Sequence, residues 1–194
     1  MIEGFVKIFD PDTGEVFVDK RNAIHFENMS EALALSIGNK PTGHIAEMHF
    51  GNGGTSVDPT GVITYLPANT TGQNADLYNQ TYFKTIDDLS SLNTDPLRNK
   101  IEIRHVAGLI YTDIVITALL DFGEPAGQQA FDNTSNFDDT YVFDELGIKS
   151  WTGTIAEGQL LTHVIFHPVQ KSLNRLIQID YTIRIQTLTN LSAL

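Results

Sequence analysis

The chain has no cysteine among its 194 residues, so neither a disulfide framework nor a thiolate metal site can form. Basic residues are scarce, because 12 Lys and Arg stand against 24 Asp and Glu and leave a formal net charge of -12. Such a charge repels nucleic acid and anionic lipid, which disfavours a DNA-facing or membrane-surface role. No apolar run approaches about 18 residues, and Met1–Phe5 lacks the pattern of a signal peptide, so a soluble chain is predicted.

The hydrophobic fraction of 41% and the charged fraction of 19% leave many positions to Thr, Asn, Ser, Gln and Gly. This composition is typical of strand-and-loop proteins. The length suits one domain with a core of its own. Because the sequence contains no internal repeat, low-complexity tract or sharp change in composition, we expect a single domain over residues 1–194.

Two β-prone runs near the N-terminus flank a turn-forming segment. The runs cover residues 4–9 and 15–18, and residues 10–14 between them contain Asp, Pro and Gly. A β-hairpin over residues 4–18 is therefore predicted. The side chains of Asp10 and Asp12 are expected to shape its turn, and Gly14 is expected to supply a turn dihedral.

One helix is predicted at about residues 29–37. The stretch is rich in helix formers, Asn28 or Ser30 is expected to cap its start, and Gly38 is expected to end it. Three apolar residues share one face at four-residue spacing: Met29, Leu33 and Ile37. We expect this face to pack flat on a sheet.

The rest of the chain is interpreted as strands. Short apolar runs broken by Gly, Asn, Asp and Pro are typical of a sandwich or barrel. Strands are predicted at residues 63–66, 82–86, 101–106, 113–120, 141–143, 160–166 and 176–187. In the last of these, apolar residues alternate with polar ones, which indicates a half-buried strand with one allowed register. The predicted fold is mainly β: an antiparallel, jelly-roll-like β-sandwich with an N-terminal β-hairpin and one short helix.

Two polar stretches, residues 67–80 and 121–140, are longer than compact domains usually tolerate without a purpose. Ordering such a loop is costly, and the cost is offset when a neighbouring molecule buries it. Both stretches are therefore interpreted as candidate partner-binding arms.

Two pairs of histidines have spacings that could suggest a metal site. His163 and His167 would share a strand face, but about 13 Å would separate them, which is too far for one ion. His44 and His49 would have a ligand spacing only on a helix, and the glycines on both sides of this segment oppose one. His44 and His49 are predicted to be surface or edge histidines.

The other candidate motifs are incomplete. Gly51–Thr55 lacks the Lys of a phosphate-binding loop and is interpreted as a tight turn with positive φ angles. Asp132–Asp139 lacks the Gly and the closing Glu of a calcium loop, and His25 and His105 belong to no nucleophile motif. We therefore predict no catalytic, cofactor-binding or metal-binding residue, and a chain that is not an enzyme.

Several short segments together resemble accessory structural proteins of tailed bacteriophages. They are Val18–His25, Met48–Thr55, Phe143–Ile148, Leu160–Phe166 and Ile179–Ile183. The resemblance implies a virion subunit, assembled in the host bacterial cytoplasm, that decorates the capsid or builds a neck, collar, tail or baseplate. It also implies a homo-oligomer that contacts other virion structural proteins and carries no active site or cofactor.

Two other classes stay open: a carbohydrate- or receptor-binding β-sandwich, and a hydrolase whose site is assembled only by the fold. A carbohydrate site needs exposed aromatic side chains, for which the sequence offers five candidates: Tyr65, Tyr78, Tyr82, Tyr141 and Trp151. Tyrosines near loops serve protein interfaces equally well. Binding to a glycan array would favour the first class, and turnover of a polysaccharide would favour the second.

Overall fold

The computed structural model describes residues 1–126 and 140–186, and predictions that fall on residues 127–139 or 187–194 lie outside this part. The described residues form strands β1 (Ile2–Phe9), β2 (Val16–Ile24), β3 (Ile45–Gly51), β4 (Thr55–Val57), β5 (Ile63–Tyr65), β6 (Gln80–Thr85), β7 (Lys100–His105), β8 (Tyr111–Leu120), β9 (Thr140–Ser150), β10 (Leu160–Ser172) and β11 (Ile177–Gln186), and one helix, α1 (Phe26–Ile37). The prediction of a mainly β fold with one short helix is confirmed.

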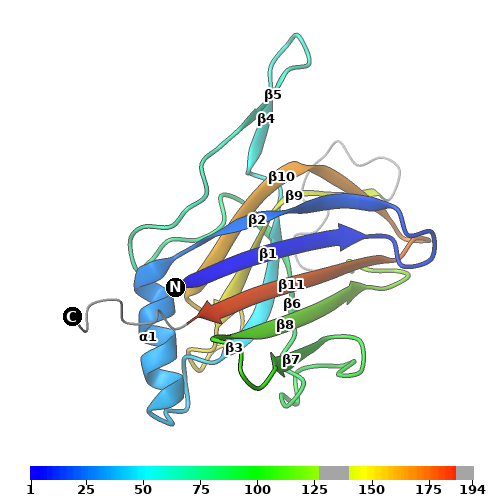
Figure 1. Ribbon diagram of the computed structural model, residues 1–194. Coiled ribbons are helices and arrows are strands. Elements are labelled where there is room, and N and C mark those ends of the chain that lie inside the picture. Colours follow the sequence, from blue (N-terminus) through cyan, green and yellow to red (C-terminus); the bar gives the residue numbers. More distant parts are fainter. Residues whose placement is uncertain (127–139, 187–194) are drawn as a thin grey trace.

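Nine of the described strands form one antiparallel sheet that curls on itself (Figure 1), in the order β6-β3-β9-β10-β2-β1-β11-β8-β7. Strand β2 joins two halves of the sheet, one made of β6, β3, β9 and β10 and the other of β1, β11, β8 and β7. It pairs with β1 along most of its length and with β10 only at Ala23 and Ile24. The apolar residues of both halves form a shared core. A strand that bends from one half to the other in this way produces a sandwich-like arrangement.

The N-terminal hairpin is confirmed and extends beyond residue 18, since β1 and β2 pair from Phe9 with Val16 to Gly4 with Asn22. Its turn depends on Gly14, which has a φ of 74°. Oδ1 of Asp10 accepts the backbone N–H groups of Asp12 (2.9 Å) and Thr13 (3.1 Å). The turn thus uses the side chain of Asp10 and the backbone of Asp12.

Helix α1 begins at Phe26, earlier than predicted, and its N-cap is His25. Nδ1 of His25 accepts the N–H of Asn28 at 3.3 Å, so the prediction of Asn28 or Ser30 as the cap is wrong. Asn28 lies inside the first turn, where its side-chain amide donates to the carbonyl of Leu160 at 2.9 Å. The helix therefore starts where the chain leaves β2.

The apolar face of α1 packs only in part. Met29 is buried and Leu33 is half-buried, but Ile37 is 85% exposed, so the prediction that the whole face packs flat is wrong. The helix lies across one end of the sandwich (Figure 1) and its last turn extends past the core. Gly38 ends the helix as predicted, with its N–H donating to Ala34 at 2.9 Å.

Strand β11 confirms the prediction from alternation. Ile179, Tyr181 and Ile183 are fully buried, while the polar residues between them are half-buried. Antiparallel pairing with β1 and β8 fixes the register, with Ile183 opposite Gly4 and Ile114. Because a shift by one residue would move every isoleucine to the other face, this register is strongly specified.

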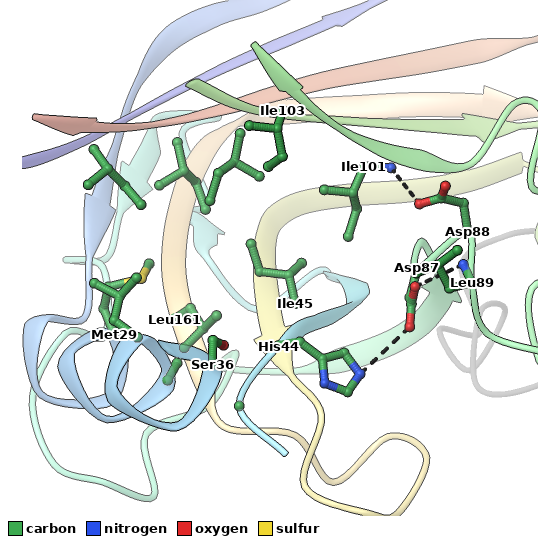
Figure 2. A pocket seen from close by; sticks show the side chains of 16 residues that line it. Met29, Ser36, His44, Ile45, Asp87, Asp88, Leu89, Ile101, Ile103 and Leu161 are labelled. Atoms are coloured by element: carbon green, nitrogen blue, oxygen red, sulfur yellow. Dashed lines mark hydrogen bonds and ion pairs between the residues drawn. The ribbon is translucent and has the colours of Figure 1, made fainter. Parts of the chain in front are cut away.

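The two edge strands of the sheet, β6 and β7, lie on the open side of the sandwich. Toward one end, Lys84 of β6 donates to the carbonyl of Leu119 in β8 and so bridges the two halves. Toward the other end, beside α1, the halves enclose an apolar pocket of about 550 Å³ (Figure 2). Ile45 of β3 and Ile103 of β7 contribute to its lining.

Candidate functional site

Residues 54–66, called the arm below, project away from the main sheet as a short hairpin (Figure 1). Strand β4 pairs with β5 over only three residues on each side. A two-stranded ribbon of this length is marginally stable in water by itself. The arm nevertheless exposes large apolar side chains, since Val57, Val62 and Tyr65 are 62%, 57% and 49% exposed. Such exposure favours contact with another molecule.

Asp58 fixes the tip of the arm. Its Oδ1 accepts the N–H of Thr60 (2.8 Å), the hydroxyl of Thr60 (2.6 Å) and the N–H of Val62 (3.0 Å). These hydrogen bonds, above all that from the Thr60 hydroxyl, lower the pKa of Asp58. Gly61 supplies a φ of 87° within the turn. The tip is therefore preformed by local interactions.

Asp144 of β9 binds the root of the arm, which is Gly54 and Thr55. Its Oδ1 accepts the N–H of Gly54 at 2.9 Å, and its Oδ2 accepts the N–H of Thr55 at 2.9 Å as well as the Thr55 hydroxyl. Burial raises the pKa of Asp144, and these hydrogen bonds only partly oppose the rise. The pairing of β9 with β10 shifts register opposite Asp144, between the pairs Glu145–Ile165 and Phe143–Val169.

Glu145 is fully buried and accepts four N–H groups. The donors are the backbone of Gly53 (3.1 Å), Tyr78 (2.9 Å) and Asn79 (2.8 Å), and Nε2 of His163 (3.0 Å). Burial alone would raise the pKa of Glu145, but the hydrogen bonds from His163 and from the backbone outweigh it and lower the pKa. One carboxylate thus connects the root of the arm, the loop before β6 and strand β10.

The predicted turn at Gly51–Thr55 is confirmed, but the reason for its glycines differs from the prediction. Positive φ angles among the described glycines occur elsewhere, for example at Gly14 and Gly61. A Cβ at Gly53 would lie 2.7 Å from the backbone nitrogen of Asn79, and one at Gly54 would lie 2.9 Å from Cγ2 of Ile165. Glycine is needed here because the turn lies directly on its neighbours.

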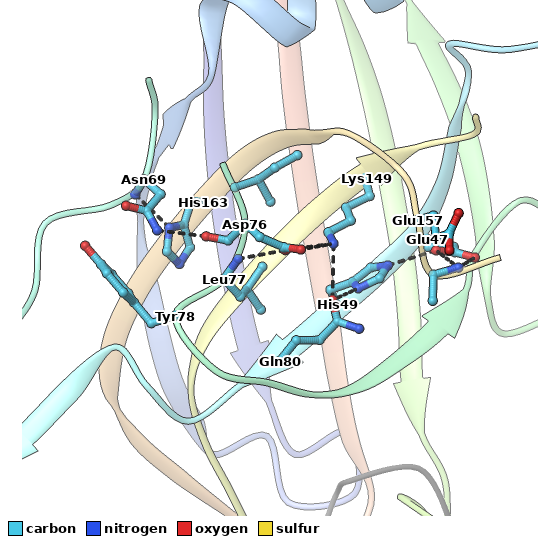
Figure 3. A network of polar contacts seen from close by, with 12 residues as sticks. Glu47, His49, Asn69, Asp76, Leu77, Tyr78, Gln80, Lys149, Glu157 and His163 are labelled. Atoms are coloured by element: carbon cyan, nitrogen blue, oxygen red, sulfur yellow. Dashed lines mark hydrogen bonds and ion pairs between the residues drawn. The ribbon is translucent and has the colours of Figure 1, made fainter. Parts of the chain in front are cut away.

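Residues 67–80 were predicted to be a partner-binding arm, but residues 67–79 lie against their own sheet (Figure 3) and Gln80 begins β6. Asn69 donates its N–H to Nδ1 of His163 at 2.8 Å, and Asp76 lies 2.7 Å from Nζ of Lys149. The carbonyl of Gly72 lies 3.0 Å from Nε2 of His25. These contacts order the loop without a partner, and the projecting part of the chain is the arm.

His49 is fully buried on β3, which has a neighbouring strand on each side, so its prediction as a surface or edge histidine is wrong. Its Nε2 lies 2.8 Å from Glu47 and its Nδ1 lies 2.6 Å from Gln80 (Figure 3). Burial lowers the pKa of His49, although the contact with Glu47 opposes this. Gln80 of β6 and Ala156 of the loop between β9 and β10 contact these two side chains, so the polar residues of β3 do not face solvent.

The other predicted candidates are dispersed. His163 is buried, whereas His167 is exposed and lies 3.3 Å from the Tyr65 hydroxyl; His44 is partly exposed, 3.6 Å from Asp87. His105 is exposed, 2.9 Å from the Thr112 hydroxyl. Within the described ranges, no three His, Asp or Glu side chains form a group that could hold a metal ion. The acidic stretch at residues 132–139 lies outside these ranges.

The two His–Glu pairs contain the residue types of general acid–base catalysis. In Glu145, however, four N–H donors occupy the oxygens that a catalytic base would offer to a substrate. The carboxylate of Glu47 likewise accepts the N–H of Ala156 at 3.1 Å from each oxygen, in addition to its contact with His49. This geometry fits a structural role, in which the carboxylates of Glu145 and Glu47 hold loops against the sheet through hydrogen bonds.

The aromatic residues considered for carbohydrate binding do not form one surface. Tyr82 and Tyr141 are buried in the core, where neither is accessible to a ligand. Tyr65 is exposed on the arm, and Tyr78 donates its hydroxyl to the carbonyl of Pro67 at 2.8 Å. Trp151 is half-buried near the ring of His44, with 6.5 Å between the ring centroids.

Comparison with known proteins finds no matching family model, no matching curated protein and no matching solved structure. Helix α1 has 12 residues, and no helix in the described part of the chain has the length and apolar character needed to span a bilayer. The fold and the site together define a sandwich-like β protein with an apolar arm on a buried polar root.

Proposed function

We propose that this chain is a non-enzymatic structural subunit of a tailed-phage virion, acting through protein–protein contacts in an oligomeric assembly. The observation that carries the proposal is the arm, which exposes Val57, Val62 and Tyr65 on a narrow ribbon. Its place in the particle would be the capsid surface, the neck or collar, or the tail or baseplate. In each, the arm would reach a neighbouring subunit.

The anchoring of the arm supports this function. Asp144 holds Gly54 and Thr55, while Asp58 holds the tip, so both ends of the ribbon are fixed before any contact forms. A preformed segment loses little conformational entropy on binding. Burial of its apolar side chains by a neighbour would then stabilise a ribbon that is marginal alone.

Three of the five segments that carry the resemblance to phage structural proteins also lie at this root. Met48–Thr55 contains the end of β3 and the turn into the arm, and Phe143–Ile148 contains Asp144 and Glu145. Leu160–Phe166 contains His163, which donates to Glu145. These three segments belong to the part of the fold that positions the arm.

Native mass spectrometry of the purified chain, together with its binding to purified phage capsids and tails, tests the proposal. We expect a defined homo-oligomer, or recruitment to one of these particles, because an apolar arm of this kind requires a neighbour. A chain that stays strictly monomeric and also fails to bind capsids and tails would contradict the proposed function.

A further inference from the structure

The apolar pocket beside α1 has the dimensions of a small-molecule site. Its volume is about 550 Å³, within the range of about 300–1,000 Å³ that is typical of ligand pockets. Of the 16 described residues that line it, six are isoleucines from four strands. They are Ile45, Ile101, Ile103, Ile114, Ile183 and Ile185.

The pocket exists because nothing in the described fold closes this part of the sandwich. Ile103 points from the edge strand β7 into the open side and is 64% exposed. Helix α1 contributes Met29 and Ser36 to the opposite wall, but Ile37 at its end is 85% exposed and does not close the pocket. An apolar ligand would therefore remove hydrophobic surface from water on both walls.

The acidic groups of the pocket lie together at one end, whereas Ser36 lies on the wall formed by α1. These acidic groups are Asp87 and Asp88, which lie away from Met29 and Leu161 at the other end (Figure 2). Backbone donors fix both carboxylates, since Asp87 accepts the N–H of Leu89 at 3.0 Å and Asp88 accepts that of Ile101 at 3.2 Å. The site thus has an apolar body and a preorganised negative end.

His44 is the remaining titratable group of the lining. Its Nε2 lies 3.6 Å from Oδ2 of Asp87. Even a protonated imidazole would therefore neutralise the charge of one carboxylate at most and leave the charge of the other. The chain as a whole has a formal net charge of -12. An anionic headgroup would therefore be repelled at this end of the pocket, and a cationic one attracted.

We propose that this pocket binds a small amphipathic cation, with its apolar body along the isoleucines and its ammonium group between Asp87 and Asp88. Apolar contact supplies the affinity, and the two carboxylates select the sign of the headgroup. This site is separate from the arm, so the proposal does not depend on the oligomeric state of the chain.

Isothermal titration with three probes of equal chain length tests the proposal: n-decylammonium and n-decanoate below their micelle concentrations, and n-decanol below its solubility limit. We expect the amine to bind more tightly than the alcohol, and the carboxylate to bind most weakly. The double substitution Asp87→Asn and Asp88→Asn should weaken amine binding about tenfold, roughly 1.4 kcal/mol, and leave alcohol binding unchanged. Equal binding of the three probes, or no binding of the amine, would overturn the proposal.

Two further comparisons distinguish binding in the pocket from general attraction to an acidic surface. Asp12→Asn with Asp19→Asn removes the same charge at exposed positions elsewhere and should leave amine binding unchanged. Ser36→Trp, on the wall of the pocket, should weaken binding of both the amine and the alcohol, whereas Ser30→Trp, exposed on the same helix, should not. Amine binding that falls equally in both Asp→Asn pairs, or that survives Ser36→Trp, would also overturn the proposal.

Discussion

The carboxylate of Glu145 and the imidazole of His163 lie 3.0 Å apart, with both side chains fully buried. Nδ1 of His163 accepts the N–H of Asn69, so Nε2 carries the proton that is donated to Glu145. The same carboxylate accepts backbone N–H groups from the root of the arm and from the loop before β6. This pair therefore connects strands β9 and β10 to both covering segments.

Replacing Glu145 with Gln keeps the shape of the side chain but replaces one acceptor oxygen with an amide NH2 group. This group is a donor and would face N–H groups that are donors themselves. We expect the free energy of unfolding to fall by about 1–3 kcal/mol, the cost of buried donors left without an acceptor. Urea unfolding at neutral pH measures the change. Glu157→Gln, at an exposed position, is the matched control and should shift stability by less than about 0.5 kcal/mol.

The lowered pKa of Glu145 predicts the pH dependence of this difference. The pKa of Glu145 in the folded protein lies below the ordinary value of 4.5, so near that pH the unfolded state binds more protons than the folded state. The stabilisation from Glu145 is present above this value and is lost as the pH falls through the folded-state pKa. The stability gap between wild type and Glu145→Gln should therefore narrow between about pH 7 and about pH 3. A gap of constant size would show that ionised Glu145 does not stabilise the fold.

His49 should make the protein less stable as the pH falls from neutral. Its pKa is lowered from 6.5 by burial, so the unfolded state takes up a proton at a pH where the folded state stays neutral. Wild type should therefore lose more stability than His49→Gln between about pH 7.5 and about pH 5.5. Urea titrations at both pH values measure this, with His105→Gln, at an exposed position, retaining the wild-type loss. Identical losses in wild type and His49→Gln would contradict the account.

Strand β11 offers a comparison between its two faces. Ile183 is fully buried, so Ile183→Asp would place an unpaired carboxylate in the core, at a cost of several kcal/mol against a typical total of about 5–15 kcal/mol. We expect no soluble folded protein. Thr182→Asp, on the half-buried opposite face, should fold. Circular dichroism and solubility decide the outcome, and folding of both variants would refute the core assignment.

Chelation should leave the fold unchanged. No group of three potential ligands occurs among the described residues, and the acidic stretch at 132–139 lacks the positions of a calcium loop. Thermal melting with and without EDTA should give the same Tm. A drop of several degrees would indicate a bound ion that stabilises the protein.

Periodicity predicted the parts of the fold where one face is apolar and the other polar. Strand β11 is the clearest case, since Ile179 and Ile183 alternate with polar residues along the whole strand. The N-terminal hairpin was equally clear, because Gly14 and Asp10 act locally. Strand β9 was predicted only at 141–143, because Asp144 and Glu145 interrupt its apolar pattern.

The sequence did not identify Asp144 and Glu145 as the residues that hold the arm, because both are buried by tertiary contacts. Polar side chains that alternate with core residues, such as Glu47 and His49, are typical of a solvent-facing surface. Here Gln80 and Ala156 contact these two side chains, and N–H donors distant in sequence satisfy Glu145. The available signal was a pair of consecutive acids in an apolar strand, together with a glycine-rich turn earlier in the chain. Their pairing could not be derived without the fold.

Native mass spectrometry of Val62→Asp tests the central claim, that the arm mediates assembly. Val62 is 57% exposed near the tip of the arm, so the substitution should leave the circular dichroism spectrum and the Tm unchanged. Leu97→Asp, at a position that is 84% exposed outside the arm, is the matched control. We predict that wild type and Leu97→Asp form the same oligomer or join the same particle, whereas Val62→Asp stays monomeric and unbound. A folded Val62→Asp variant that assembles like wild type would contradict the account.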